Sequence, residues 1–154
     1  LLTDDFPTAS FLAAGEGALR LPLERAAASL GARFQFLGFV SDALRFIAGC
    51  RVGVVASRGS EAVSRAALEW MSCARPVVAA RVGCLAELIE DGVTGLLVPP
   101  SQPKALASAL ACLLEDPLAA ERMGRAGRAR FERLFTLARF GERTERFYEE
   151  TLRS

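Results

Sequence analysis

Residues 52–79 read VGVVASRGSEAVSRAALEWMSCARPVVA, and this stretch decides the expected fold. The apolar run 52–56 is typical of a buried strand, and residues 57–60 are turn formers. Residues 62–71 are rich in helix formers, and Arg75-Pro76 leads into a second apolar run. The order strand, turn, helix, strand predicts an α/β unit whose helix begins with unpaired backbone amides that point at a ligand.

The first turn of this helix is a candidate phosphate site beside Ser64 and Arg65, because the helix dipole gives it partial positive charge. Glu61 and Glu69 flank it. If both are helical, their carboxylates lie roughly 12 Å apart and about 80° round the axis. Paired glycosidase carboxylates lie about 5 to 9.5 Å apart, so the spacing favours an extended ligand held at both ends. From spacing alone, the alternative is two solvated carboxylates.

An ordered series of residues continues from this pair. Glu69 follows Glu61 after seven residues, and then come WMSCARPVVA (70–79), Val82-Gly83, ELIEDGVTGLLVPP (87–100) and Asp116-Pro117 with a basic helix after it. This series resembles the retaining glycosyltransferases of family 4. The resemblance covers most of the chain, from about Phe11 onward.

The resemblance implies the C-terminal, donor-binding domain of a two-domain GT-B enzyme that transfers a hexose from a UDP- or GDP-linked sugar. Glu61 would be the catalytic residue and hold hydroxyls of the transferred sugar, and Glu69 would hold the ribose hydroxyls. Charge on the leaving diphosphate would be stabilised electrostatically. The remaining donor contacts would come from Ala62, Val63, Ser64 and Arg65. The implied acceptor is a glycan or a lipid-linked acceptor, as in polysaccharide or lipopolysaccharide biosynthesis.

Two features depart from the family pattern. Ala62-Val63-Ser64 stands where the family has a Gly-aromatic-Gly segment. The Arg and Lys that the family places on the diphosphate, upstream of the first strand, have no counterpart in residues 1–7. With the N-terminal acceptor-binding domain also missing, we expect the chain alone to bind a nucleoside diphosphate weakly and to transfer no sugar.

Glycine turns after three other apolar runs are further candidates. The resemblance places Gly15 in a loop that lines the cleft, Gly38 and the backbone of Val40 against the base, and Gly83 near the sugar or a phosphate. On the sequence alone, each has a plain alternative. Gly15 fits a strand-to-helix turn, Gly38 a tight turn before a helix, and Gly83 a helix-start glycine.

The expected helices have clear start and stop signals. Gly31 ends a helix over residues 21–30, Asp42 caps one over 43–48, Pro103 starts one over 104–115, and Asp116-Pro117 starts the next. Five arginines between residues 122 and 133 predict a solvated face on that helix. A final amphipathic helix over 137–152 carries Phe140, Phe147 and Tyr148, and the resemblance implies that it crosses to the missing domain.

Strands alternate with helices five times, and each strand is short and apolar on both faces. This pattern predicts an α/β, Rossmann-like parallel sheet covered by helices, with Gly15, Gly38, Gly83 and the 57–65 unit meeting at its carboxyl edge. A nucleotide-sugar epimerase shares this architecture, and a non-catalytic nucleotide-binding α/β module is a second alternative. The chain lacks the acidic cluster of response regulators and the G-x-G-x-x-G of dinucleotide-binding modules.

Composition bears on the number of domains, the partners and the need for a metal. The 154 residues fit one domain, 1–154, and the first residue is Leu1, so we expect a piece of a longer protein. Lys and Arg number 19 against 18 Asp and Glu, which gives no reason to expect nucleic acid as a partner. The scheme that the resemblance implies requires no metal and no cofactor beyond the donor, which is consistent with the absence of histidine and of an Asp-x-Asp.

The four cysteines, at positions 50, 73, 84 and 112, form no C-x-x-C pair. We expect reduced, mostly buried thiols in a cytoplasmic protein, with a disulfide as the alternative. No apolar run approaches the length of a membrane span. A peripheral position at the inner membrane face is left open for the full-length protein.

Overall fold

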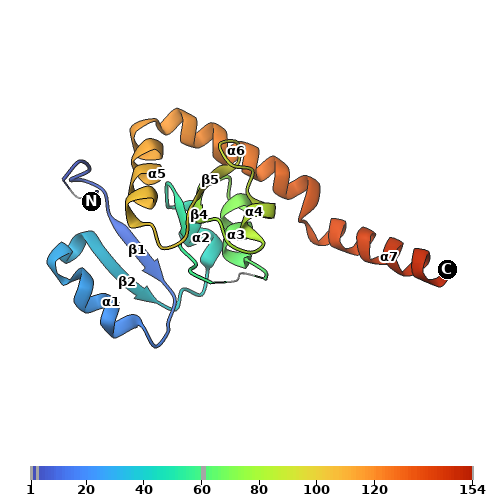
Figure 1. The fold of residues 1–154 in the computed structure, drawn as a ribbon, viewed down its shortest axis with the longest axis horizontal. Helices are drawn as coiled ribbons and strands as arrows, with labels where there is room; N and C mark the ends of the chain where they lie inside the picture. Colours follow the sequence, from blue (N-terminus) through green and yellow to red (C-terminus); the bar gives the residue numbers. More distant parts are fainter. Residues whose placement is uncertain (1, 3, 60–61, 154) are drawn as a thin grey trace. The chain divides into compact units, whose positions relative to one another are not determined.

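The computed structural model describes residues 2, 4–59 and 62–153 (Figure 1). The chain forms two compact units, Leu1–Phe46 and Ile47–Ser154. Strands alternate with helices in chain order, and every pairing between strands is parallel. The predicted α/β class with parallel strands is confirmed, in the form of one two-stranded and one three-stranded sheet.

The first unit holds a small sheet in which β1 (Phe11–Ala14) pairs with β2 (Phe34–Gly38). The ring of Phe34 lies 6.3 Å from that of Phe11 and 4.9 Å from that of Phe36, centroid to centroid, which ties the strands together. Both strands alternate half-buried and exposed side chains. The prediction that every strand is buried on both faces is therefore wrong for this sheet.

The strands of the first unit are joined by α1 (Arg20–Ala27) and the 3₁₀ segment η1 (Ala28–Arg33). The predicted helix over 21–30 is too long as an α-helix, because the amide of Ala28 bonds back only three residues, to the carbonyl of Arg25. Gly31 does break the helical path, with φ of 54° and ψ of −138°. A residue with a Cβ rarely adopts that φ.

Eight elements lie wholly in the second unit. They are β3 (Gly53–Val55), α3 (Arg65–Ser72), β4 (Val77–Ala80), α4 (Leu85–Leu88), β5 (Gly95–Val98), α5 (Pro103–Glu115), α6 (Pro117–Leu134) and α7 (Leu137–Arg153). α2 (Ala43–Ala48) crosses the boundary between the units, and Asp42 caps it as predicted, accepting from the amide of Arg45 at 2.9 Å. Asp116 likewise caps α6, accepting from the amide of Ala119 at 2.9 Å.

The core of the second unit surrounds β4, the central strand of the order β3–β4–β5. All four residues of β4 are buried. Figure 1 shows this sheet between α5 on one side and α3 and α4 on the other. The core cluster is made of Val55, Ala67, Val77, Ala79, Leu85, Leu88 and Ile89. A Cβ at Gly53 of β3 would overlap the ring of Trp70, so the packing of that ring on β3 requires glycine.

The helix after β3 begins later than predicted. α3 starts at Arg65 rather than Ala62, because Ser64 is extended, with φ of −110° and ψ of 90°, and its hydroxyl accepts from the amide of Ala67. This is N-cap geometry, which stops the helix from extending backward. The prediction of a helix that includes Ala62 is therefore wrong. The spacing estimated for Glu61 and Glu69 stays a prediction, because Glu61 lies outside the described residues.

The solvated arginine face predicted for α6 is wrong for Arg130, which is half-buried, whereas Arg128 is exposed but also bonds to another helix. Arg128 donates to the carbonyl oxygen of Ser72, and Arg130 donates to those of Leu88 and Glu87 at 2.9 and 2.8 Å. Arg122, Arg125 and Arg133 are exposed. Charge periodicity alone does not distinguish an arginine that faces water from one that reaches across to another element.

α7 matches its predicted bounds within one residue and has no buried residue. In Figure 1 it continues from the end of α6 away from the β3–β4–β5 sheet. The four cysteines, all within the described residues, form no disulfide. The prediction that most are buried is wrong, since Cys112 is exposed and the others are half-buried. Among the described helices, none combines the length and apolar content that crossing a bilayer requires.

Candidate functional site

The carboxyl ends of β3, β4 and β5 share one edge of the second unit, because the three strands run parallel. A pocket of ≈ 330 Å³ opens at this edge, beside the start of α5. Its lining is mostly apolar and includes Ala56, Arg58, Ala80, Val98, Ser101 and Leu106. Ligands of parallel α/β sheets bind at this edge, so the pocket belongs to the candidate site.

The segment that enters α3 lies next to the same edge, since it follows β3. Ala62 and Val63 are exposed, with Val63 at 73%, whereas Ser64 is 2% exposed and capped into the helix. The amides of Arg65 and Ala66 have no acceptor within the described residues. Two free amides and the positive end of the dipole make this helix start suitable for an anion.

Glu69 lies one turn into α3, four residues after Arg65. It is half-buried, and its carboxylate makes no hydrogen bond or ion pair with any residue that the structure describes. Arg65, although it is four residues away on the same helix, is not its ion-pair partner. A carboxylate that no described side chain occupies is available to a ligand that donates hydroxyl groups.

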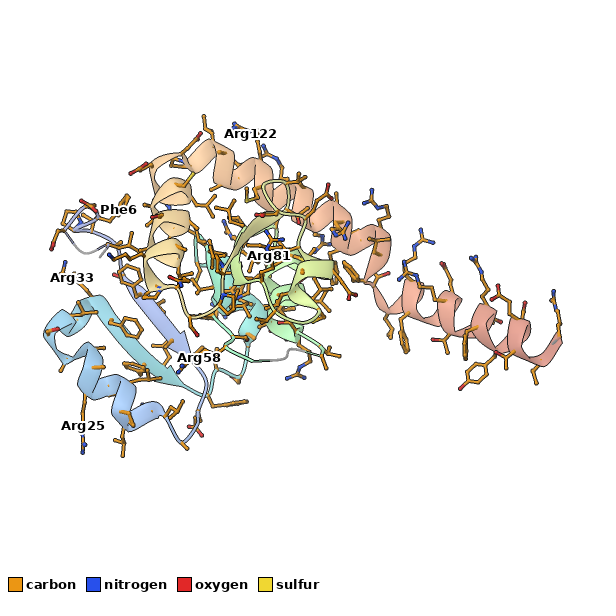
Figure 2. All side chains as sticks on the ribbon, viewed as in Figure 1. Phe6, Arg25, Arg33, Arg58, Arg81 and Arg122 are labelled. Carbon is orange, nitrogen blue, oxygen red and sulfur yellow. The ribbon has the colours of Figure 1, made fainter. Side chains whose placement is uncertain are left out.

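Arg58 is a candidate that the sequence analysis did not select. It follows β3, lines the pocket and is the charged residue of the described lining (Figure 2). It is exposed and forms no ion pair within the described part of the chain. The available signal was its place between a strand end and a helix start, where a cation can reach an anionic ligand.

Gly83 lies in the segment between β4 and α4 and has φ of 50°. Arg81, at the start of this segment, is fixed twice: its amide donates to the carbonyl of Val98 at 2.8 Å, and its guanidinium pairs with Asp91 at 2.5 Å. Asp91 also accepts from the amide of Leu97 at 2.9 Å. The Gly83 segment is thereby tied to β5.

In the first unit, Gly15 and Gly38 lie at the carboxyl ends of β1 and β2 and are joined by a 2.7 Å hydrogen bond from the Gly15 amide to the Gly38 carbonyl. Gly38 has φ of 67°, and a Cβ there would lie 3.0 Å from a guanidinium nitrogen of Arg20. Val40 is half-buried beside them. The three predicted residues therefore share one edge of the small sheet.

The predicted residues thus fall into two groups. Gly15, Gly38 and Val40 are together in the first unit, and the helix start, Glu69 and Gly83 are in the second. Their meeting in one cleft stays a prediction. Glu61 lies outside the described residues.

The described residues hold no group of three histidine, cysteine, aspartate or glutamate side chains in reach of one metal ion. The shift in pKa that the structure does resolve lies outside the site. Burial raises the pKa of the Cys50 thiol, and the charge of Arg75 partly opposes that rise.

Comparison with known proteins identifies the family. Residues 1–116 match the family model described as glycosyl transferases group 1. The chain is 40% identical over 128 residues to D-rhamnosyltransferase WbpZ of Pseudomonas aeruginosa, covering 79% of this chain and 33% of that protein. It is 34% identical over 144 residues to alpha-D-kanosaminyltransferase of Streptomyces kanamyceticus, covering 91% of this chain and 37% of that protein. The chain thus spans about a third of the length of these relatives.

The fold agrees with solved structures of such enzymes. Anabaena HepE, crystallised in complex with UDP, superposes with a TM-score of 0.83 at 26% identity, over 93% of this chain and 42% of that one. The chain therefore belongs to the glycosyl transferases group 1 family and corresponds to the C-terminal domain of its GT-B enzymes.

Proposed function

We propose that this chain binds a UDP- or GDP-linked sugar as the donor half of a retaining, family 4 glycosyltransferase. The observation that carries the proposal is that α3 holds both the helix-start amides and the Glu69 carboxylate, none of which has a partner among the described residues. Four residues separate Arg65 from Glu69, a rise of about 6 Å along the axis. That separation suits a diphosphate at the helix start and a ribose diol at Glu69.

Each group has a matching ligand chemistry. The free amides of Arg65 and Ala66 would donate to phosphate oxygens, and the guanidinium of Arg65 would add charge-assisted hydrogen bonds. The carboxylate of Glu69 is an acceptor only, so it fits the two hydroxyls of a ribose rather than a phosphate. Arg58, which has no ion-pair partner among the described residues, supplies a second cation for the diphosphate.

The rest of the enzyme scheme follows the family resemblance. Glu61 holds the transferred hexose, and negative charge that develops on the leaving diphosphate is stabilised by the α3 amides. The acceptor is a glycan or lipid-linked glycan bound by another domain, in the cytoplasm or at the inner membrane face. We propose that no metal takes part, since arginines and helix amides neutralise the diphosphate.

Calorimetric titration with UDP, GDP, UDP-glucose, GDP-mannose and NAD tests the proposal. We expect one nucleoside diphosphate to bind weakly and NAD not to bind. Glu69→Gln removes a charged acceptor, a loss of about 1.5 to 3 kcal/mol, so the affinity for the nucleoside diphosphate should fall about 10-fold or more. Glu61→Gln should leave that affinity unchanged and lower only the affinity for the nucleotide sugar.

Glu145→Gln is the matched control, because Glu145 is exposed on α7 and forms no ion pair in the described part of the chain. Equal losses of nucleoside diphosphate affinity in the Glu69 and Glu61 variants would refute the assignment of roles. Binding of NAD in preference to both nucleoside diphosphates would favour a dinucleotide-binding module instead.

A further inference from the structure

Arg130 of α6 contacts the end of α4. Its Nε donates to the carbonyl of Leu88 at 2.9 Å, and one terminal nitrogen donates to that of Glu87 at 2.8 Å. Its guanidinium carbon lies 5.9 Å from the centre of the Phe135 ring, and its side chain is only 21% exposed. The last carbonyls of a helix lack partners within it, and the planar guanidinium can serve two of them at once.

Arg128 makes the corresponding contact at the end of α3. It donates to the carbonyl of Ser72, the last residue of that helix, while its Nε is held by Glu132 at 2.7 Å. Two arginines that are two residues apart on α6 therefore hold the carboxyl-terminal ends of α3 and α4, the helices that precede and follow β4 in the sequence.

Gly124 allows α6 to come close enough for these contacts, and Gly127 faces the same way. A Cβ at Gly124 would overlap the carbonyl of Ala74, just after α3. A Cβ at Gly127 would already be in contact with Thr94, at 3.4 Å from its carbonyl oxygen, and would lie 3.8 Å from Met71 of α3. The approach of α6 to α3 is therefore built into the backbone of α6.

Arg128 and Arg130 contact α3 and α4, whose amino-terminal ends lie at the candidate site. α3 has eight residues and α4 only four, lengths at which an isolated helix is not stable in water. Their positions must therefore come from tertiary contacts, namely the packing of Ala67, Leu85 and Leu88 in the core and the contacts at the helix ends. The Gly83 segment is held by Arg81 and Asp91 at one end, and Arg130 holds α4 at the other.

We propose that Arg128 and Arg130 are positioning residues for the donor site: by holding the carboxyl-terminal ends of α3 and α4, they set the start of α3 and the Gly83 segment where the nucleotide sugar is bound. The ligand in this inference rests on the proposed function. Neither arginine touches the ligand in this arrangement. They act through main-chain carbonyls at the carboxyl-terminal ends of the helices, away from the site.

The test compares Arg130→Met and Arg128→Met with Arg122→Met. Arg122 is exposed on the same helix, extends outward in Figure 2, and makes no hydrogen bond or ion pair among the described residues. Two quantities are measured well below the unfolding temperature: amide hydrogen exchange of Leu88 and Ile89, which bond within α4, and calorimetric affinities for UDP, GDP, UDP-glucose and GDP-mannose.

Arg130→Met should speed exchange of the Leu88 and Ile89 amides about tenfold. It should also lower the affinity for the nucleotide sugar about three- to tenfold, with less effect on the affinity for the nucleoside diphosphate. Arg128→Met should lower the affinity for the nucleoside diphosphate itself by a similar factor, because the proposed diphosphate site is on α3. Arg130→Lys keeps the charge but not the two-carbonyl geometry, so its affinity should lie between those of the native chain and Arg130→Met.

Lower thermal stability with affinities equal to those of Arg122→Met would overturn the inference, since the arginines would then only stabilise the fold. Unchanged exchange at Leu88 and Ile89 in Arg130→Met would overturn the anchoring itself. Failure of the native chain to bind any of the four nucleotides would instead refute the proposed function, so the two failures are distinguishable.

Discussion

α6 and α7 follow one another in the second unit, have 18 and 17 residues, and both contain several arginines, yet only α6 has buried residues. In α6, Ala120, Gly124 and Gly127 are buried. In α7 no residue is buried, and the ion pairs that the structure describes there, such as Arg139 with Glu142, stay within the helix. Both helices carry arginines, and α7 has the stronger amphipathic pattern, so the small residues of α6 make the difference.

The comparison shows that an apolar stripe does not by itself secure a helix. α7 carries a clear stripe with Phe140 at 66% and Phe147 at 64% exposed, and nothing in the described chain covers it. α6 has a weaker stripe but allows backbone-to-backbone approach through its glycines. Close approach then brings arginines within reach of carbonyl groups on other helices.

The largest effect that would test this comparison is expected for Gly124→Ala. In an exposed helix this change would be favourable by about 1 kcal/mol, but here the new methyl group would overlap the carbonyl of Ala74. We expect a net loss of about 1 to 3 kcal/mol in the free energy of unfolding, measured by urea denaturation. A gain in stability would mean that α6 does not depend on close approach.

Gly141→Ala makes the same chemical change in α7. No atom lies within 4 Å of the position where the Cβ would be placed, so only helix propensity acts. We expect α7 to become more stable by about 0.5 to 1 kcal/mol, seen as slower amide exchange around residue 141. A loss of stability would show that α7 packs against another part of the chain at this position.

The smallest effect is expected for Phe147→Ser. Because the ring is mostly exposed, its loss should change the free energy of unfolding by no more than about 0.5 kcal/mol. Urea denaturation at low protein concentration measures this value without self-association. A loss above about 1 kcal/mol would place Phe147 in a packed contact and remove the contrast between the helices.

Much of this architecture could be predicted from local signals. The bounds of α2 match, α5 and α7 differ by one residue, and the Asp116 cap with Pro117 marks the start of α6, because caps, prolines and apolar spacing act within a few residues. The start of α3 was missed because Ala62 has good helix propensity. The Ser64 hydroxyl, which bonds the amide of Ala67, outweighs it.

The supporting contacts of the candidate site could not be predicted in this way. Glu69 and Gly83 follow from a motif, but the roles of Arg128 and Arg130 depend on which main-chain groups α6 meets, 56 and 42 positions away. Charge spacing on α6 does not distinguish these two arginines from Arg122. The same applies to Arg58, whose importance comes from a pocket formed by three strand ends and a helix.

The main-chain acceptors of Arg128 and Arg130 are oxygen atoms that every amino acid possesses. Evolution can therefore replace Ser72, Glu87 or Leu88 without removing the acceptor that Arg128 or Arg130 uses. Among homologues, the arginine positions should then vary little while the positions they contact drift, and no paired substitution should connect them. A search for co-varying residues would overlook this contact, although it joins the last helix of the packed core to the two helices nearest the proposed donor site.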